Sequence, residues 1–188
     1  MIPAASVRGP QRAGGTVEGV VTMLTREQLT EEQWRTVRNT PHHVAIAVSA
    51  AGGSIFDEML ERAAAMSGIV DALNSRHPLV QGIGASADIM AAQDQLRSWY
   101  HGLDDSERRA ANLQAKALAM FKDAIAMLEA RGQRDDVRVY CDFVIALATR
   151  VARTAREGDV LGIGGELVSG GERSFIALLE AATTADGR

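Results

Sequence analysis

The chain has 188 residues, of which 46% are hydrophobic but only 4% aromatic, and its formal net charge is −4. This length suits one domain, the aliphatic composition favours close-packed helices over sheets, and the negative charge excludes a general attraction to nucleic acid or anionic lipid. The single cysteine, Cys141, excludes an intramolecular disulfide, and without an apolar leader or a membrane-spanning run of roughly 20 residues the chain is expected to be cytoplasmic.

The chain divides into an arm, one domain and a short tail. Residues 1–24 hold two of the four prolines and several glycines, a composition that predicts a mobile arm. Helical patterns fill residues 25–183, which we interpret as a single helical domain. Residues 184–188 are expected to fray.

Three helix starts are predicted in the first part of this domain. Thr30, followed by Glu31-Glu32-Gln33, has the spacing of a capping box. Thr40-Pro41 combines a good capping residue with one that suits the first helical turn, and the run 44–51 after it is apolar on nearly every side, as in a buried helix. A further helix opens after Gly52-Gly53, and its apolar stripe consists of Ile55, Met59, Ala63, Met66, Val70 and Leu73.

The second half predicts four more helices joined by short turns. They cover residues 88–100, a long segment from the capping residues 104–106 to Gly132, another from Asp135 to about residue 157, and a last helix that opens with a capping box at Ser169 and Glu172. Apolar stripes on such helices must be buried against one another. The predicted fold is therefore all-α, a compact multi-helix bundle of about six to seven helices with antiparallel helix pairs.

Two regions share a plan of helix, glycine turn and capped helix. Residues 41–66 contain Ala50-Ala51-Gly52-Gly53-Ser54-Ile55-Phe56-Asp57-Glu58, and residues 148–181 contain a glycine-rich turn from Gly158-Asp159 to Ser169-Gly170-Gly171-Glu172. This plan resembles the helix–loop–helix units of the tellurite-resistance TerB-like superfamily, in which an Asp-Gly turn leads into a Ser-x-x-Glu helix start. The resemblance implies an all-helical fold and a stress-associated, metal-binding role. The first turn here, Ala51-Gly52-Gly53, lacks that family's acidic residue, whereas the second keeps Asp159.

Carboxylates near these two turns are the candidate ligands for a divalent metal. Hard cations prefer oxygen ligands, and the candidates are Asp57, Glu58, Glu61, Asp159 and Glu172. The favoured alternative is that they are solvated helix-start charges, because helix dipoles stabilise carboxylates there. The Glu-x-x-His motif of di-iron bundles is absent at all four histidines, and no other cofactor is expected.

Catalytic motifs are absent from the sequence. The segment from Gly158 to Gly171 has six glycines in fourteen residues but no basic residue to hold a phosphate, so we interpret it as a connector. Cys141 lies on an apolar stripe, where a buried and inert thiol is expected. An enzyme assembled from distant residues would need a deep polar pocket near His42, His101 or Glu58.

Candidate partner-binding residues lie on two of the predicted helices. Arg150, Arg153 and Arg156 recur every three residues, and Trp99 ends the helix of residues 88–100. Arginines near a helix C-terminus are also stabilising in themselves, and nucleic-acid binding is not favoured because no aromatic residues alternate with them. We hypothesise a cytosolic, non-catalytic interaction or stress-associated module that binds a protein partner or self-associates. The alternative is a carboxylate-based metal- or small-ligand-binding bundle.

Overall fold

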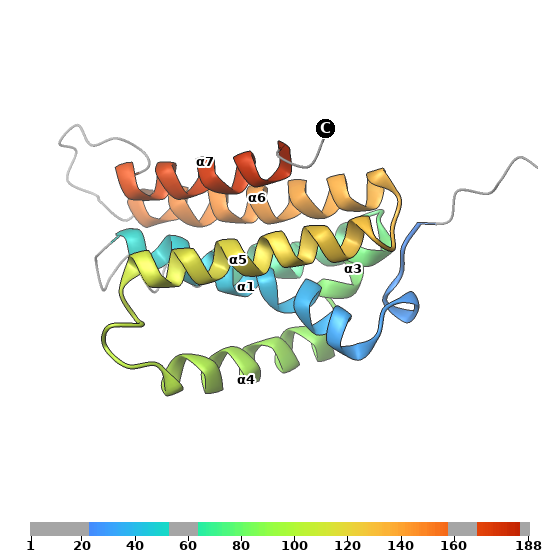
Figure 1. Ribbon diagram of the computed structural model, residues 1–188, viewed down its shortest axis with the longest axis horizontal. Coiled ribbons are helices and arrows are strands. Elements are labelled where there is room, and N and C mark those ends of the chain that lie inside the picture. The colour runs from blue at the N-terminus through green and yellow to red at the C-terminus, as the bar shows by residue number, and fades with distance from the viewer. Residues whose placement is uncertain (1–22, 53–63, 158–168, 185–188) are drawn as a thin grey trace, which may run out of the picture.

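The computed structural model describes residues 23–52, 64–157 and 169–184. Every regular element in these ranges is a helix, which confirms the predicted all-α bundle (Figure 1). The predicted arm, except for its last two residues, and the tail from residue 185 lie outside the described residues. None of the described helices is both long enough and apolar enough to cross a bilayer.

One long helix lies at the centre of the bundle. The elements are η1 (Arg26–Gln28), α1 (Glu31–Gly52), a helical stretch over residues 64–71, η2 (Ala72–Asn74), α3 (Pro78–Ile83), α4 (Ser86–Gly102), α5 (Ala110–Glu129), α6 (Arg134–Glu157) and α7 (Gly170–Thr184). Helix α1 contacts α4, α5, α6 and α7. Helix α6 runs antiparallel to both α5 and α7, and α4 lies along the other side of α1 (Figure 1).

The predicted helix start at Thr40-Pro41 is wrong, because α1 continues unbroken through Pro41. Proline has no N–H to donate to the carbonyl four residues earlier, which belongs to Val37. The hydroxyl of Tyr140 on α6 donates to that carbonyl at 3.1 Å instead. A long-range hydrogen bond thus satisfies the backbone group that the proline leaves unpaired.

Both predicted capping boxes are present. The N–H of Gln33 donates to Thr30 Oγ1 at 3.2 Å, and the N–H of Thr30 donates to Gln33 Oε1 at 3.0 Å. At the start of α7, the N–H of Glu172 donates to Ser169 Oγ at 3.2 Å, and the N–H of Ser169 donates to Glu172 Oε2 at 2.7 Å. Each box satisfies backbone donors that have no partner within the helix.

We expect the substitution Ser169→Ala to lower the free energy of unfolding by about 1 kcal/mol, because it removes the acceptor of the Glu172 N–H. Urea denaturation of the purified protein measures this loss. Ser174→Ala, also on α7, is the control, since the Ser174 hydroxyl only donates to the Gly170 carbonyl within the helix. Equal stability of Ser169→Ala and wild type would show that the box does not stabilise α7.

The predicted start of the long helix at residues 104–106 is also wrong. The Asp104 carboxylate accepts hydrogen bonds from the N–H groups of Ser106 and Glu107, at 2.8 and 2.9 Å. These bonds lower the pKa of Asp104. They close a separate turn over residues 105–108, and α5 begins only at Ala110.

The core is aliphatic with a few large rings, as the composition predicted. The predicted inner face of α6 is buried, apart from the half-buried Val137, and consists of Tyr140, Cys141, Val144, Leu147, Ala148 and Val151. The largest fully buried side chains include Trp34, Phe121, Tyr140 and Phe175. Burial of these apolar surfaces is the main favourable term that holds the helices together.

A buried ion pair joins α1 to the start of α4. Asp88 Oδ1 accepts from Trp34 Nε1 at 2.7 Å and from Arg38 Nη1 at 3.3 Å, and Asp88 Oδ2 accepts from Arg26 Nη1 at 2.8 Å. The side chains of Arg38 and Asp88 are only 3% and 5% exposed. The guanidinium of Arg38 also donates to Gln95 Oε1, so Arg38 is fixed at two points of α4.

A second buried carboxylate joins three segments of the chain. Asp136 Oδ1 accepts from the N–H of Leu24 at 2.8 Å and lies 2.9 Å from His77 Nε2. Asp136 Oδ2 accepts from the N–H of Gln133 at 2.6 Å, which caps α6. The first described residues, the start of α3 and the start of α6 therefore meet at one side chain.

Candidate functional site

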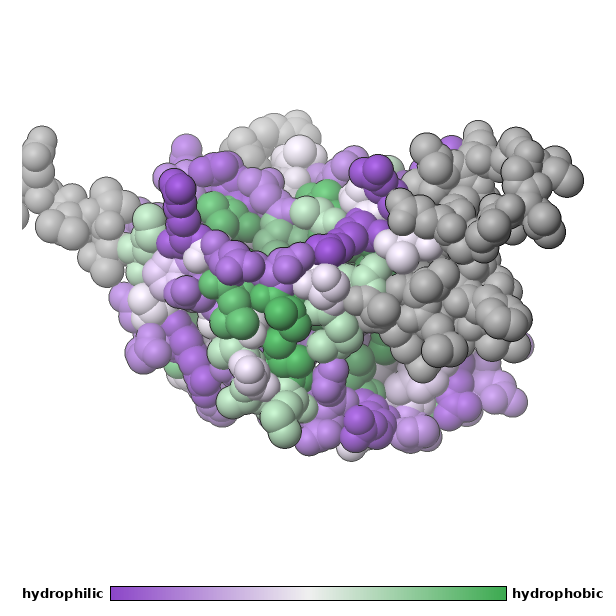
Figure 2. All heavy atoms as spheres, turned by 180° about the vertical axis from the view of Figure 1, so that it is seen from behind, coloured by the Kyte–Doolittle hydropathy of each residue, from purple (hydrophilic) through white to green (hydrophobic). Residues whose placement is uncertain are grey.

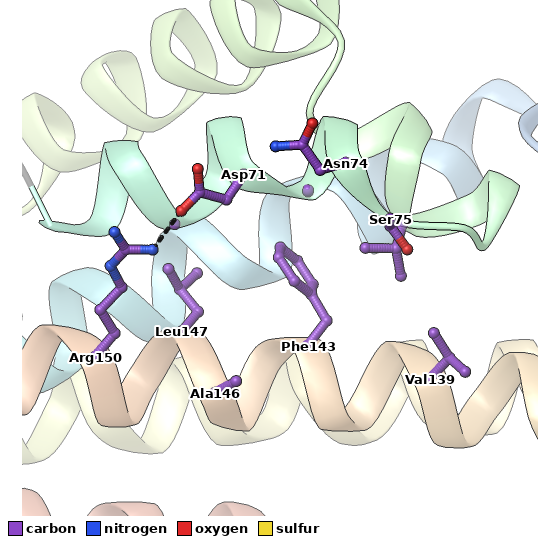
Figure 3. Close-up of a pocket in the computed structure, with 11 residues that line it drawn as sticks. Asp71, Asn74, Ser75, Val139, Phe143, Ala146, Leu147 and Arg150 are labelled. Carbon is purple, nitrogen blue, oxygen red and sulfur yellow. Dashed lines mark hydrogen bonds and ion pairs between the residues drawn. The ribbon is translucent and has the colours of Figure 1, made fainter.

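A groove lies between α6 and the segment of residues 68–80, with a volume of about 410 Å³. Its α6 wall is mostly apolar and carries Val139, Phe143, Ala146, Leu147 and Arg150; its other wall carries Gly68, Asp71, Ala72, Asn74, Ser75 and Val80. Figure 3 shows the ring of Phe143 pointing from α6 towards the opposite wall, with the small side chain of Ala146 beside it. The groove is therefore an apolar hollow with polar groups at its edges.

Glycine brings the two walls together at one end of the groove. A Cβ atom on Gly68 would lie 2.6 Å from Leu147 Cδ1, so a larger residue there would force the Leu147 side chain or the segment to shift. Next to this contact, Arg150 reaches across from α6. Its Nη1 lies 2.6 Å from Asp71 Oδ2, and its Nη2 donates to Ser67 Oγ at 2.9 Å (Figure 3). The ion pair closes this end of the groove.

A second hollow of about 520 Å³ continues past Arg150 along α6. Its residues are Ala146, Thr149, Arg150, Arg153 and Thr154, so it shares Ala146 and Arg150 with the groove. The hydroxyls of Thr149 and Thr154 donate to carbonyls of their own helix. Arg153 is exposed and makes no ion pair with another described residue. Among the described side chains, the positive charge of Arg153 in the second hollow therefore has no acidic partner.

The face of the molecule opposite to that in Figure 1 has apolar side chains at its surface. Figure 2 shows hydrophobic residues above and below a band of hydrophilic residues that crosses the middle of this face. Val70 and Leu73, next to the groove-lining Asp71 and Ala72, are 45% and 41% exposed. These two exposed apolar side chains extend the apolar character of the groove to its outer edge.

The structure brings together two of the four residues predicted to bind a partner. Arg150 and Arg153 both line the second hollow. Trp99 is half-buried on α4, where its ring meets that of His43 edge-on at 4.3 Å between centroids, and it lines neither hollow. The side chain of Arg156 lies outside the described residues.

Only one of the five predicted metal ligands can be placed. Glu172 is buried in the capping box of α7, with Oε1 lacking a partner among the described residues. Asp57, Glu58, Glu61 and Asp159 lie outside the described residues. Within the described ranges, no three histidine, cysteine or acidic side chains are grouped as a metal site requires. The metal site therefore stays a prediction.

Three histidines are buried and lie outside both hollows. Burial lowers the pKa of His42 to about 4, helped by the charges of His43 and Arg38. Burial also lowers the pKa of His43 to about 4, helped by Lys116. His77 pairs with Asp136, and its Nδ1 is buried without a partner among the described residues. None of these three rings lines either hollow, so the polar pocket that an enzyme would need near His42, His101 or Glu58 stays a prediction.

Cys141 is expected to resist thiol reagents in the folded protein. Burial, together with the negative charges of Asp142 and Glu129, raises the pKa of its thiol to about 12. Because the thiolate is the reactive form, Ellman's reagent at pH 8 should modify Cys141 only as fast as the protein unfolds. Reaction in urea provides the control for full reactivity, and fast modification of the native protein would contradict the burial.

Sequence reasoning missed the residues that form the apolar groove. It identified the inner face of α6 but not the second apolar stripe, formed by Val139, Phe143 and Ala146 at helical spacings of four and three. This spacing is a signal that could have found them. The opposite wall was not predictable in the same way, because it comes from residues about seventy positions earlier.

Comparison with known proteins gives no relative for this chain. No family model matches it, no curated protein is significantly similar to its sequence, and no solved structure is significantly similar to its fold. The resemblance to the TerB-like superfamily therefore stays a prediction, and function has to be argued from the site itself.

Proposed function

We propose that this protein is a non-catalytic interaction module that binds a helical segment of a partner protein in the apolar groove along α6. The observation that carries this proposal is the groove itself, whose α6 wall presents the half-buried Phe143 and the exposed Ala146 opposite residues 68–80. An amphipathic helix binds such a groove by placing its apolar face in it. The stress-associated role implied by the TerB-like resemblance is compatible with this binding.

The dimensions of the site favour a peptide over a small molecule. The two hollows follow α6 from Val139 to Thr154, which corresponds to a length of about 22 Å at 1.5 Å per residue. Small-molecule sites enclose most of the ligand surface, whereas this site extends along one face of a helix. A partner helix of about fifteen residues would match its length.

Selection of helical peptides from a displayed random library against the full chain tests this function. We expect most selected peptides to bind in the groove, so that Ala146→Gln and Phe143→Ala each weaken binding about ten-fold. Ala146 is exposed, so a longer side chain there obstructs the groove without entering the core. Fluorescence anisotropy of labelled peptides measures the dissociation constants.

Met90→Ala is the matched control for Phe143→Ala. Met90 is 65% exposed on α4 and lines neither hollow, so its loss removes a large apolar side chain elsewhere on the surface. Circular dichroism checks that all variants are folded. If the selected peptides bind the groove variants as tightly as wild type, the groove is not a binding site and the proposed function is wrong.

A further inference from the structure

We infer that the partner helix carries carboxylates at one end and binds with that end against Arg153. This inference rests on the proposed function and specifies the chemistry of the partner. It follows from the order of the two hollows along α6: the apolar groove comes first, and the hollow that contains Arg153 continues it past Arg150. A single ligand that fills both must be apolar over most of its length and polar at that end.

Within the described part of the chain, the charges along the site leave the Arg153 end positive. Arg150 is neutralised by Asp71, at 2.6 Å, and its guanidinium is held in place by this bond. At the Val139 end, Arg138 lies between two carboxylates, those of Asp135 and Asp142. Of the described side chains that line the two hollows, Arg153 is the basic one that no described acidic group balances.

The chemistry of Arg153 favours carboxylate over an uncharged partner. Its guanidinium offers planar pairs of N–H donors that match the two oxygens of a carboxylate. The threonine hydroxyls beside it already donate to α6, so they present only acceptor lone pairs to a ligand. Arg153 is thus the main donor that the second hollow offers, and an acidic side chain is the group that it fits.

Two designed peptides test this inference on the full chain. Each has fifteen residues with leucine and alanine on one helical face; one carries two glutamates in its terminal turn and the other carries glutamines there. We expect the glutamate peptide to bind wild type about two- to five-fold more tightly at low salt, the range for an exposed ion pair. This advantage should fall as salt is raised, and it should disappear in Arg153→Gln.

Arg76→Gln is the control for a general effect of net charge. Arg76 is exposed next to Ser75, at the other end of the groove, and lines neither hollow. The variant has the same net charge as Arg153→Gln, but it should keep the preference for glutamate. Equal loss of preference in both variants would show that only net charge acts, and would overturn the inference.

The remaining outcomes separate this inference from the proposed function. If Ala146→Gln weakens the binding of both peptides but wild type binds them equally, the groove binds helices and the inferred acidic end of the partner is wrong. If neither peptide binds, or Ala146→Gln weakens neither, the inference and the proposed function fail together. Sedimentation of the free protein tests a second copy as the occupant: a wild-type dimer that Ala146→Gln dissociates would replace the partner helix with self-association.

Discussion

The substitution Asp88→Asn is expected to lower the free energy of unfolding by about 3–5 kcal/mol, because it removes one charge of a buried ion pair. The guanidinium of Arg38 is 3% exposed and would keep its charge without a carboxylate to balance it. Asparagine can still accept a hydrogen bond from Trp34 Nε1, so the loss measures the charge more than the hydrogen bond. Urea denaturation followed by tryptophan fluorescence gives the free energy.

Asp94→Asn on the same helix is the matched control. Asp94 also pairs with an arginine, Arg97, but the two side chains are 73% and 66% exposed. An exposed pair contributes at most about 1 kcal/mol, so this variant should be close to wild type. If Asp88→Asn and Asp94→Asn cost the same small amount, the buried pair is not an important element of the fold.

A double substitution separates the ion pair from the local effects of each change. In Asp88→Asn, the further substitution Arg38→Met removes the unbalanced charge and keeps an apolar side chain of similar length. We expect the double variant to recover part of the stability that Asp88→Asn loses, because buried ion pairs are often replaced by apolar residues at little cost. Strictly additive losses would contradict a direct coupling between Arg38 and Asp88.

Local patterns in the sequence predicted the helices but not what lies between them. The capping boxes at Thr30 and Ser169 depend on residues three positions apart, and both were predicted correctly. Asp88 and Asp94 look equivalent in the sequence, as acidic residues on one amphipathic helix. They differ only because Asp88 meets Arg38, fifty residues away in the chain, and this pairing depends on how α4 packs on α1.

Proline shows how a local rule can fail for a tertiary reason. Pro41 predicted a helix start because its missing N–H leaves a carbonyl unpaired within a helix. In the fold, the Tyr140 hydroxyl pairs with that carbonyl, so the helix continues. Tyr140 was correctly placed on the inner face of α6, but the sequence does not show which backbone group its hydroxyl would reach.

The candidate site, too, was predictable only in part, because it depends on packing between distant segments. Arg150 and Arg153 stand out from their spacing on one helix, and both line the second hollow. The apolar groove depends on the close approach of Gly68 to Leu147, two residues from different segments. The apolar residues of one wall can be recognised from their helical spacing in the sequence. The opposite wall is known only once the two segments are seen packed together.

Lowering the pH from 7.5 to 4.5 is expected to destabilise the protein by on the order of 2–3 kcal/mol for each of His42 and His43. Burial holds the pKa of both imidazoles near 4 in the folded protein, against 6.5 in the unfolded chain. Between these values the unfolded chain binds protons that the folded protein does not, so stability falls as the pH falls. Well above pH 6.5 both histidines are neutral in either state, and the stability that they contribute is fully present.

The surroundings of the two rings oppose their protonation. Arg38 on α1 and Lys116 on α5 place positive charges near His42 and His43 respectively, and each imidazolium would repel the other. The ring of His43 also packs against Trp99, so it cannot turn outwards to water without losing that contact. Protonation at low pH must therefore loosen the packing of α1 against α4 and α5.

His42→Leu and His43→Leu test the origin of this pH dependence, with His101→Gln as the control on an exposed histidine. Carboxyl groups in general also gain protons in the acid range, so the comparison is between slopes and not between absolute stabilities. Each leucine variant should remove about half of the part of the stability loss between pH 7.5 and 4.5 that the two histidines cause. His101→Gln should keep the wild-type slope of stability against pH. If both leucine variants keep the wild-type slope of stability against pH, the two rings gain as many protons in the folded protein as in the unfolded chain. The two histidines would then not be the cause of acid unfolding.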